Sequence, residues 1–430
     1  MPIELRTLER QRQISTFDSL GLRPQLLRAV KDLGFTTPTA IQLESIPAAL
    51  AGKDVLASAK TGSGKSAAFG LPILDALIDQ PRGKTRALIL APTRELAAQI
   101  AEHLSALAKH TTIKVAAVYG GVGFGPQAAA FRRGTDIIVA TPGRLQDHLN
   151  QKTANLKDVT YLVLDEADRM LDMGFLPVVR KLLRHIPAQR QTLFFSATMP
   201  DAIEALTKEM LHNPIRVELS PETGVPANEV TQTIYSIDQM RKVDLFLELL
   251  KDNTIYSAIA FTRTKARANR LAAALDKANI PSDRIHGDRS QAQRTRTLAD
   301  FKRGKFRVLV ATDIAARGID IEALGHVINY DVPLVPEDYV HRIGRTARAE
   351  LKGDAITFVS HDEEKYFSQI ERQLGRRLDR AKNPPLPEVS AHHTPPREAR
   401  EPQRFVPHPS RAKRPAGQNG GRPSRSKQHK

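Results

Sequence analysis

The sequence predicts an α/β protein built from two consecutive domains, each a parallel β-sheet covered by helices. The chain has 430 residues. That is too long for one ordinary hydrophobic core, and it suits two domains of about 150–200 residues with tails. Short apolar runs also alternate with helix-length segments in both halves, which is the pattern of strand–helix–strand units.

Each apolar run has the length of a buried strand. In the first half, the expected strands cover residues 54–58, 87–90, 115–118, 137–139, 161–164 and 193–195. Helices are expected over residues 95–109 and from residue 66 onward. In the second half, the expected strands cover residues 258–261, 308–310, 327–329 and 356–359. The second half therefore repeats the architecture of the first, but it has no second phosphate-binding loop.

The domain boundaries follow from changes in composition. We expect an N-terminal extension over residues 1–15, a first domain over 16–219 and a second domain over 231–378. Residues 220–230 are polar and contain two prolines and a glycine, so they are interpreted as a linker. Residues 379–430 are interpreted as a disordered basic tail, because the last fifty residues hold eleven Lys and Arg against three Asp and Glu.

Composition argues against several classes of protein. The chain has no cysteine, which excludes disulfides and thiolate metal sites. Residues 1–15 lack the apolar core of a signal peptide, and no apolar run approaches the ~18–20 residues that span a bilayer. We therefore expect a cytoplasmic protein without a membrane partner. The formal net charge of +17 favours a polyanionic partner.

Two motifs in the first half predict a site for a nucleoside triphosphate. Residues 59–66, AKTGSGKS, fit the phosphate loop G-x-x-x-x-G-K-[ST] if Ala59 replaces its first glycine. Lys65 would reach the β- and γ-phosphates, and the Ser66 hydroxyl would bind Mg²⁺. The acidic tetrad 165–168, DEAD, directly follows an apolar run. Its carboxylates are thus expected at the C-terminal end of a buried strand, where α/β sheets bind ligands.

Further motifs follow in a fixed order: GFTTPTAIQ at 34–42, SAT at 196–198, ATDIAARGID at 311–320 and YVHRIGRTAR at 339–348. Together with the first two motifs, they give residues 17–358 a resemblance to the DEAD-box ATP-dependent RNA helicases, and most to the bacterial RhlE-type subgroup. This resemblance implies tandem RecA-like domains with ATP between them. Ala40 and Ala347 stand where the family usually has proline and glycine.

The resemblance implies an ATP site with residues from both domains. Gln42 would contact the adenine edge, and Phe17 would stack on the base. Asp165 would hold Mg²⁺, and Glu166 would position the attacking water. The residues implied to bind ATP are Phe17, Phe35, Gln42, Ala59, Lys60, Thr61, Gly62, Ser63, Gly64, Lys65, Ser66, Gly318 and Asp320. The implied catalytic residues are Lys65, Asp165, Glu166 and the arginine fingers Arg345 and Arg348.

Two further groups of residues are implied by the same resemblance. Coupling between ATP and RNA is expected from Asp168, Ser196, Thr198, His341 and Arg342. RNA binding is expected from Thr93, Arg94, Gly121, Thr141, Pro142, Arg144, Arg263, Gly287, Gln291, Arg294 and Thr312. These are hydroxyls, guanidinium groups and glycine backbone, which bind phosphates and sugars and so favour sequence-independent recognition.

The expected function is an RNA-stimulated ATPase that unwinds short RNA duplexes or remodels ribonucleoproteins, acting as a monomer. Ribosomal or RNA-decay complexes are conceivable partners by resemblance. An ATP-gated RNA clamp or assembly scaffold with little unwinding activity remains an alternative, since it needs the same motifs. A DNA-translocating motor is disfavoured by the glutamine motif at 34–42 and by the DEAD form of the tetrad. A metabolic nucleotide enzyme would not need arginines from a second domain.

Overall fold

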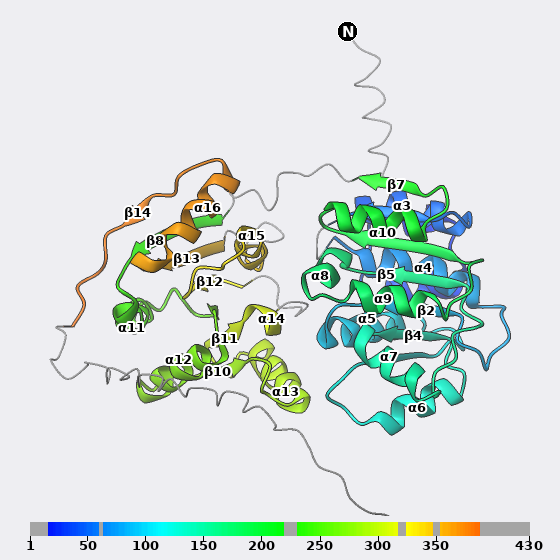
Figure 1. Cartoon of the computed structure of the whole chain (residues 1–430), viewed down its shortest axis with the longest axis horizontal. Coiled ribbons are helices and arrows are strands. Elements are labelled where there is room, and N and C mark those ends of the chain that lie inside the picture. The colour runs from blue at the N-terminus through cyan, green and yellow to red at the C-terminus, as the bar shows by residue number, and fades with distance from the viewer. Residues whose placement is uncertain (1–15, 60–62, 219–229, 317–323, 347–352, 388–430) are drawn as a thin grey trace, which may run out of the picture. The chain divides into compact units, whose positions relative to one another are not determined.

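The computed structural model describes residues 16–59, 63–218, 230–316, 324–346 and 353–387. Two seven-stranded sheets, all of whose strand pairs are parallel, form its framework (Figure 1). The strand orders are β3-β4-β2-β5-β6-β1-β7 and β10-β11-β9-β12-β13-β8-β14. This confirms the predicted α/β fold with two parallel-sheet domains.

The first domain contains the strands β1 to β7. Their bounds are β1 Val55–Ser58, β2 Ala87–Leu90, β3 Val115–Val118, β4 Ile137–Ala140, β5 Tyr161–Leu164, β6 Gln191–Ser196 and β7 Ile215–Glu218. The helices are η1 Phe17–Leu20, α2 Pro24–Asp32, α3 Ala40–Leu50, α4 Lys65–Leu77, α5 Arg94–Leu107, α6 Phe124–Arg132, α7 Pro142–Asn150, α8 Ala167–Asp172, α9 Leu176–Leu183 and α10 Asp201–Met210.

Alternate residues along strands β1 to β6 of the first domain enter two different cores. Val163 on β5 packs with residues of α2 to α5, whereas its neighbours Leu162 and Leu164 pack with residues of α7 to α10. Side chains of a strand point alternately to its two faces. Both faces are therefore covered by helices, which explains why these strands are apolar throughout instead of alternating.

The second domain contains the remaining strands and helices. The strands are β8 Val230–Ser236, β9 Ala258–Thr262, β10 Ser282–Ile285, β11 Val308–Thr312, β12 His326–Asn329, β13 Gly353–Val359 and β14 Arg380–Ala381. The helices are η2 Gln239–Arg241, α11 Lys242–Leu249, α12 Lys265–Lys277, α13 Gln291–Lys302, α14 Asp313–Ala316, α15 Pro336–Ile343, η3 His361–Glu363 and α16 Glu364–Leu374.

Short polar turns connect strand ends to capped helices at the edge where the motifs lie. The Thr93 hydroxyl accepts a hydrogen bond from the Leu96 N–H at the start of α5, and Thr264 does the same for α12. Ser290 and Gln293 form a capping box that starts α13. Each cap fixes where a helix begins after a strand, and so it positions the motif residues in between.

Four strands were not predicted, and three of them are sheet edges. β7, β10 and β14 are largely exposed or half-buried, so they lack the apolar run that marks a central strand. β8 is also mostly polar, although it lies between β13 and β14. Because β14 pairs with β8, the second sheet reaches past residue 379, where the tail was expected to begin.

Several predicted segments fall outside the described residues. They are the N-terminal extension, residue 219 at the end of the first domain, residues 220–229 of the linker and residues 388–430 of the tail. Among the helices that the structure does describe, none has the length and apolar character needed to cross a membrane.

Candidate functional site

The phosphate loop leads from β1 into α4, as the motif requires. Gly64 is the residue before α4 and has φ of 91°, in the left-handed region. A Cβ atom at this position would lie 2.5 Å from Nε2 of Gln42 and 2.9 Å from Oγ1 of Thr39. Both the backbone conformation and the lack of space therefore require glycine here. Lys60, Thr61 and Gly62 lie outside the described residues.

The glutamine motif holds the phosphate loop from the side. The Gln42 amide donates from Nε2 to the Gly64 carbonyl at 3.1 Å and accepts at Oε1 from the Thr39 N–H at 2.9 Å. The Thr39 hydroxyl donates to the Ser63 carbonyl at 2.8 Å. In this structure, Gln42 thus contacts the loop, whereas the resemblance implied a contact with adenine. Thr39 was missed, although its place before a helix marks it as a capping residue.

The two aromatic residues implied to bind ATP, of which Phe17 was expected to stack on the base, pack on each other. The Phe17 and Phe35 rings stack with centroids 6.5 Å apart and 25° between their planes. Only 4% of Phe17 is exposed, while Phe35 is half-buried and meets the His103 ring edge-on. Phe35 consequently offers more accessible ring surface than Phe17.

Lys65 and Asp165 form a buried ion pair at the centre of the site. Nζ of Lys65 lies 3.5 Å from Oδ1 of Asp165 and donates a hydrogen bond to the Ala59 carbonyl at 3.2 Å. Burial raises the pKa of Asp165, and the charge of Lys65 opposes this rise. Oδ1 of Asp165 is buried without a hydrogen-bond partner. A buried carboxylate oxygen with spare acceptor capacity fits Mg²⁺. Ser66, the other implied ligand, lies in the first turn of α4.

Glu166 occupies an unusual backbone conformation beside Asp165. Its φ of 54° and ψ of 53° are left-handed, which is uncommon for a residue other than glycine. Oε2 of Glu166 accepts a hydrogen bond from Nη1 of Arg169 at 2.8 Å, and both side chains are buried. Arg169 was not among the predicted residues. Its i, i+3 spacing from Glu166 was the available signal.

The structure brings Asp168, Ser196 and Thr198 together. Oδ2 of Asp168 accepts from the N–H groups of Ala197 and Thr198 and from the Thr198 hydroxyl, at 2.9–3.1 Å. The Ser196 hydroxyl accepts from the Asp168 N–H at 3.1 Å. These contacts join the end of β5 to the end of β6, so a shift of one would move the other.

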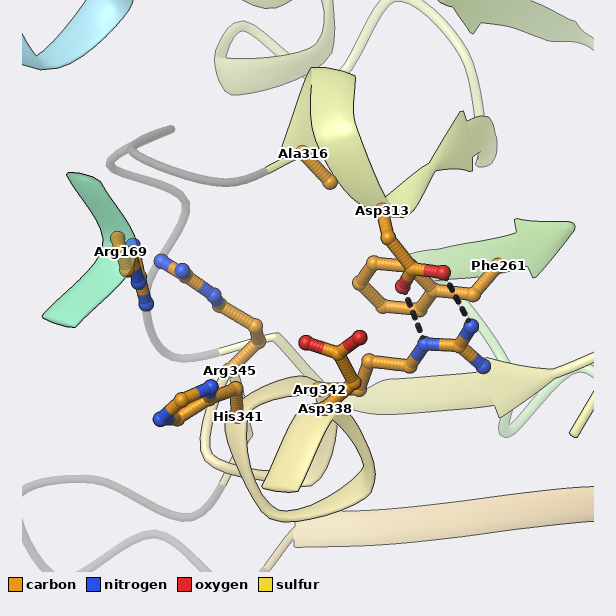
Figure 2. Close-up of a pocket in the computed structure, with 8 residues that line it drawn as sticks. All are labelled: Arg169, Phe261, Asp313, Ala316, Asp338, His341, Arg342 and Arg345. Atoms are coloured by element: carbon orange, nitrogen blue, oxygen red, sulfur yellow. Dashed lines mark hydrogen bonds and ion pairs between the residues drawn. The ribbon is translucent and has the colours of Figure 1, made fainter. Parts of the chain in front are cut away.

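Arg342 is held by the second domain on all sides. Its guanidinium makes a bidentate ion pair with Asp313, with both N–O distances at 2.6 Å, and it lies over the ring of Phe261. Nη1 donates to Asn329 and to the Asp331 carbonyl. Figure 2 shows this paired guanidinium beside Asp313. Arg342 therefore positions the turn after β11 and has no free edge for a ligand.

A small pocket beside this pair is also lined by four further titratable side chains, those of Arg169, Asp338, His341 and Arg345. Figure 2 shows the guanidinium groups of Arg169 and Arg345 facing each other near the imidazole of His341. Burial lowers the pKa of His341, and the charge of Arg169 lowers it further. Arg345 is 6% exposed. Arg348, Gly318 and Asp320 lie outside the described residues.

Most of the residues implied for RNA binding line one cavity of about 580 Å³. They are Thr93, Arg94, Gly121, Thr141, Arg144, Gly287 and Arg294. Pro142, Arg263, Gln291 and Thr312 do not line it. The lining also includes Glu95, Asp147, Met173 and Phe175, which were not predicted. Met173 and Phe175 follow α8, and nothing in the polar motifs pointed to them.

Two arginines of this cavity support the loop that contains Gly120 and Gly121. Gly121 has φ of 85°, and a Cβ there would collide with the Arg94 guanidinium. Arg144 donates from Nε to the Tyr119 carbonyl at 3.2 Å and from Nη2 to the Val122 carbonyl at 2.7 Å. The glycines are thus needed so that a guanidinium can pack flat against the backbone.

Arg294 and Gln291 are both paired with one carboxylate. Nη2 of Arg294 lies 3.0 Å from Oε2 of Glu95, and Nε2 of Gln291 donates to Oε1 of Glu95 at 2.9 Å. All three side chains are buried. Any phosphate bound by Arg294 must therefore compete with Glu95 or share the guanidinium with it.

Comparison with known proteins agrees with this geometry. Residues 39–206 match the DEAD/DEAH box helicase model, and residues 241–350 match the helicase conserved C-terminal domain. The DEAD-box ATP-dependent RNA helicase CshA of Bacillus cereus is 43% identical over 376 residues, which are 87% of this chain and 71% of that protein. The ATP-dependent RNA helicase DbpA of Bacillus subtilis is 41% identical over 377 residues, covering 88% of this chain and 78% of the relative. The chain belongs to the DEAD/DEAH box helicase family.

Solved structures show the same fold. Saccharomyces cerevisiae Dbp5 bound to RNA and ADP BeF3 matches with a TM-score of 0.76 and 32% identity, over 84% of this chain and 94% of that one. Mss116p bound to ssRNA and AMP-PNP matches with a TM-score of 0.78 and 28% identity, over 86% and 80%. The narrower resemblance to the RhlE-type subgroup stays a prediction, since the relatives described above carry the names CshA and DbpA.

Proposed function

We propose that this chain is an ATP-dependent RNA helicase, whose ATP hydrolysis is coupled to sequence-independent RNA binding and local duplex unwinding. The observation that carries this proposal is the buried pair of Lys65 and Asp165 at the end of the phosphate loop. The named relatives, and the solved relatives that hold RNA with a nucleotide, support it.

Each residue of the site has a separate role in ATP hydrolysis. Lys65 binds the β- and γ-phosphates, and Glu166 orients a water for in-line attack on the γ-phosphorus. Asp165 and Ser66 would hold Mg²⁺, which would neutralise charge on the phosphate oxygens. Arg345 and Arg348 stabilise negative charge that spreads over the transferring phosphoryl group.

Coupling to RNA is proposed to run through the short contacts between motifs. Asp168 ties the tetrad to the Ser196-Ala197-Thr198 turn. Arg94 and Arg144 lie in the 580 Å³ cavity, where guanidinium groups suit phosphate recognition without reading bases. A monomer working in the cytoplasm fits this scheme, with ribosomal or RNA-decay complexes as proposed surroundings.

Displacement of a labelled strand from a short RNA duplex tests the proposal. The protein is expected to release the strand with ATP, but not with ADP or with the Glu166→Gln variant. An ATP-dependent RNA complex that forms without any strand release would contradict unwinding and favour the clamp alternative.

A further inference from the structure

Lys242 is the least expected buried residue in the second domain. It is 0% exposed at the first position of α11, although lysine is almost never fully buried unless it is paired. Burial lowers the pKa of its ammonium group. The N-terminus of a helix also disfavours a cation. Several contacts must therefore offset these costs.

The contacts of Lys242 are two buried carboxylates and one carbonyl. Nζ lies 2.5 Å from Oε2 of Glu363 and 3.5 Å from Oδ1 of Asp331, and it donates to the Tyr330 carbonyl at 2.9 Å. Asp331 is 0% exposed and Glu363 1%. The Ser360 hydroxyl adds a further hydrogen bond to Glu363. The ammonium group is thus fully satisfied, and it joins α11 to the ends of β12 and β13.

The same two carboxylates hold Arg263, the residue directly after β9. Oε1 of Glu363 accepts from Nη2 of Arg263 at 2.7 Å, and Oδ2 of Asp331 accepts from the Arg263 N–H at 2.8 Å. Arg267 pairs with the other oxygen of Asp331. One buried charge network therefore fixes both the backbone and the side chain of Arg263.

The Arg263 side chain still has unused binding capacity. It is 28% exposed, and its Nε is buried without a hydrogen-bond partner. Its guanidinium also lies over the Tyr366 ring, with 5.6 Å to the centroid. The guanidinium is therefore held at Nη2 by Glu363 and the Val332 carbonyl and is oriented by a ring, so its exposed part has a fixed position.

We infer that Lys242 and Glu363 are positioning residues for RNA: they clamp Arg263 in the orientation in which it binds a backbone phosphate. This inference rests on the proposed RNA-binding function of Arg263. Buried ion networks often contribute little to stability compared with apolar packing, so fixing a geometry is the role that best accounts for this one.

The test combines Glu363→Gln, Arg263→Gln and the double variant in a mutant cycle. The readouts are the single-stranded RNA concentration at half-maximal ATPase stimulation, kcat at saturating RNA, KM for ATP and the melting temperature. Glu248→Gln, on α11 and paired with the exposed Lys251, is the carboxylate control outside the buried network. Leu275→Ala, a buried position on α12, controls for a loss of domain stability alone.

Each single variant is expected to raise the half-saturating RNA concentration about tenfold, the size of one charge-assisted hydrogen bond. KM for ATP and kcat should stay within about twofold. The double variant should be no weaker than Arg263→Gln alone, because the two residues act through one contact. Leu275→Ala should lower the melting temperature without this change in RNA affinity.

Two results distinguish the clamp of Arg263 by Glu363 from the RNA-binding role of Arg263 on which it rests. If Arg263→Gln weakens RNA binding but Glu363→Gln does not, the clamp is overturned while the RNA role of Arg263 stands. If Arg263→Gln has no effect on RNA, then the RNA role of Arg263 is itself wrong, and the network serves stability only.

Discussion

Nζ of Lys65 lies 3.5 Å from Oδ1 of Asp165, and both side chains are at least nine-tenths buried. The two residues come from motifs that are far apart in the sequence, and the parallel order of β1, β6 and β5 brings them to the same sheet edge. The pair concentrates charge in a dry environment, where electrostatic interactions are strong. A ligand that carries phosphates and a divalent cation can insert between these two charges.

Replacement of Lys65 should remove most of the ATPase activity. Lys65→Met is expected to lower kcat about 10²–10³-fold, because the variant lacks the fixed positive charge that stabilises the negative charge developing in the transition state. Steady-state hydrolysis with saturating RNA measures this. Lys53→Met, an exposed lysine just before β1, should leave the rate unchanged. Equal losses for both variants would contradict the assigned role of Lys65.

The phosphate loop should not accept a side chain at residue 64. Gly64→Ala places a Cβ 2.5 Å from Nε2 of Gln42 and forces alanine into the left-handed region, at about 1–2 kcal/mol for the backbone alone. ATP binding, measured by titration of a fluorescent analogue, should weaken by more than tenfold. Gly174 has φ of 71°, and a Cβ atom there would have no atom within 4 Å. The Gly174→Ala variant therefore measures the free-energy cost of the left-handed backbone alone. Its ATP affinity is expected to stay normal.

Arg169 should stabilise the first domain through Glu166. Arg169→Met removes the partner of a buried carboxylate, which typically costs about 3–5 kcal/mol. Urea denaturation of the variant gives the change in unfolding free energy. Arg180→Met, in the exposed pair with Glu209, should change the unfolding free energy far less, because water and salt screen an exposed ion pair. If both variants lose a similar amount of unfolding free energy, burial does not determine how much the ion pair of Arg169 and Glu166 stabilises the domain.

Acid should destabilise the first domain partly through His148. This side chain is 0% exposed, stacks on Phe124 and hydrogen-bonds Gln127 and Thr153. Burial and the charge of Arg144 lower its folded pKa below the ordinary value of 6.5. The unfolded state therefore binds more protons once the pH drops below about 6.5, and stability should fall in that window.

Melting temperatures between pH 7.5 and pH 5 measure this effect. His148→Gln is expected to reduce the acid-induced loss, although His103 of the same domain also has a lowered pKa and keeps part of it. Identical pH profiles for wild type and variant would contradict a contribution from His148.

The basic tail should strengthen RNA binding through charge alone. A chain ending at residue 387 loses most of the eleven Lys and Arg of the last fifty residues. Its RNA affinity should fall, and its dependence on salt concentration should become shallower, because fewer counterions are released on binding. Fluorescence anisotropy at several salt concentrations measures both. If the slope of RNA affinity against salt concentration is unchanged, the tail takes no part in RNA binding.

Sequence reasoning predicted the central strands because their residues are apolar on both faces. The edge strand Ile215–Glu218 was not predicted, because only one of its residues is buried and it has no apolar run. Within the site, motif spacing indicated Lys65 and Asp165. For Arg169, the sequence offered only its i, i+3 spacing from Glu166, and the structure shows the hydrogen bond between them. The ion pair of Lys242 and Glu363 could not be predicted from the sequence, because the two residues are 121 positions apart and belong to no motif.

Steady-state ATP hydrolysis with no nucleic acid, with single-stranded RNA and with DNA of equal length tests the central claim most directly. Glu166→Gln controls for contaminating ATPase. Strong stimulation by RNA but not by DNA is the expected result, because the proposed site takes residues from both domains and RNA is proposed to bring them together. Equal rates under all three conditions would contradict an RNA-coupled ATPase.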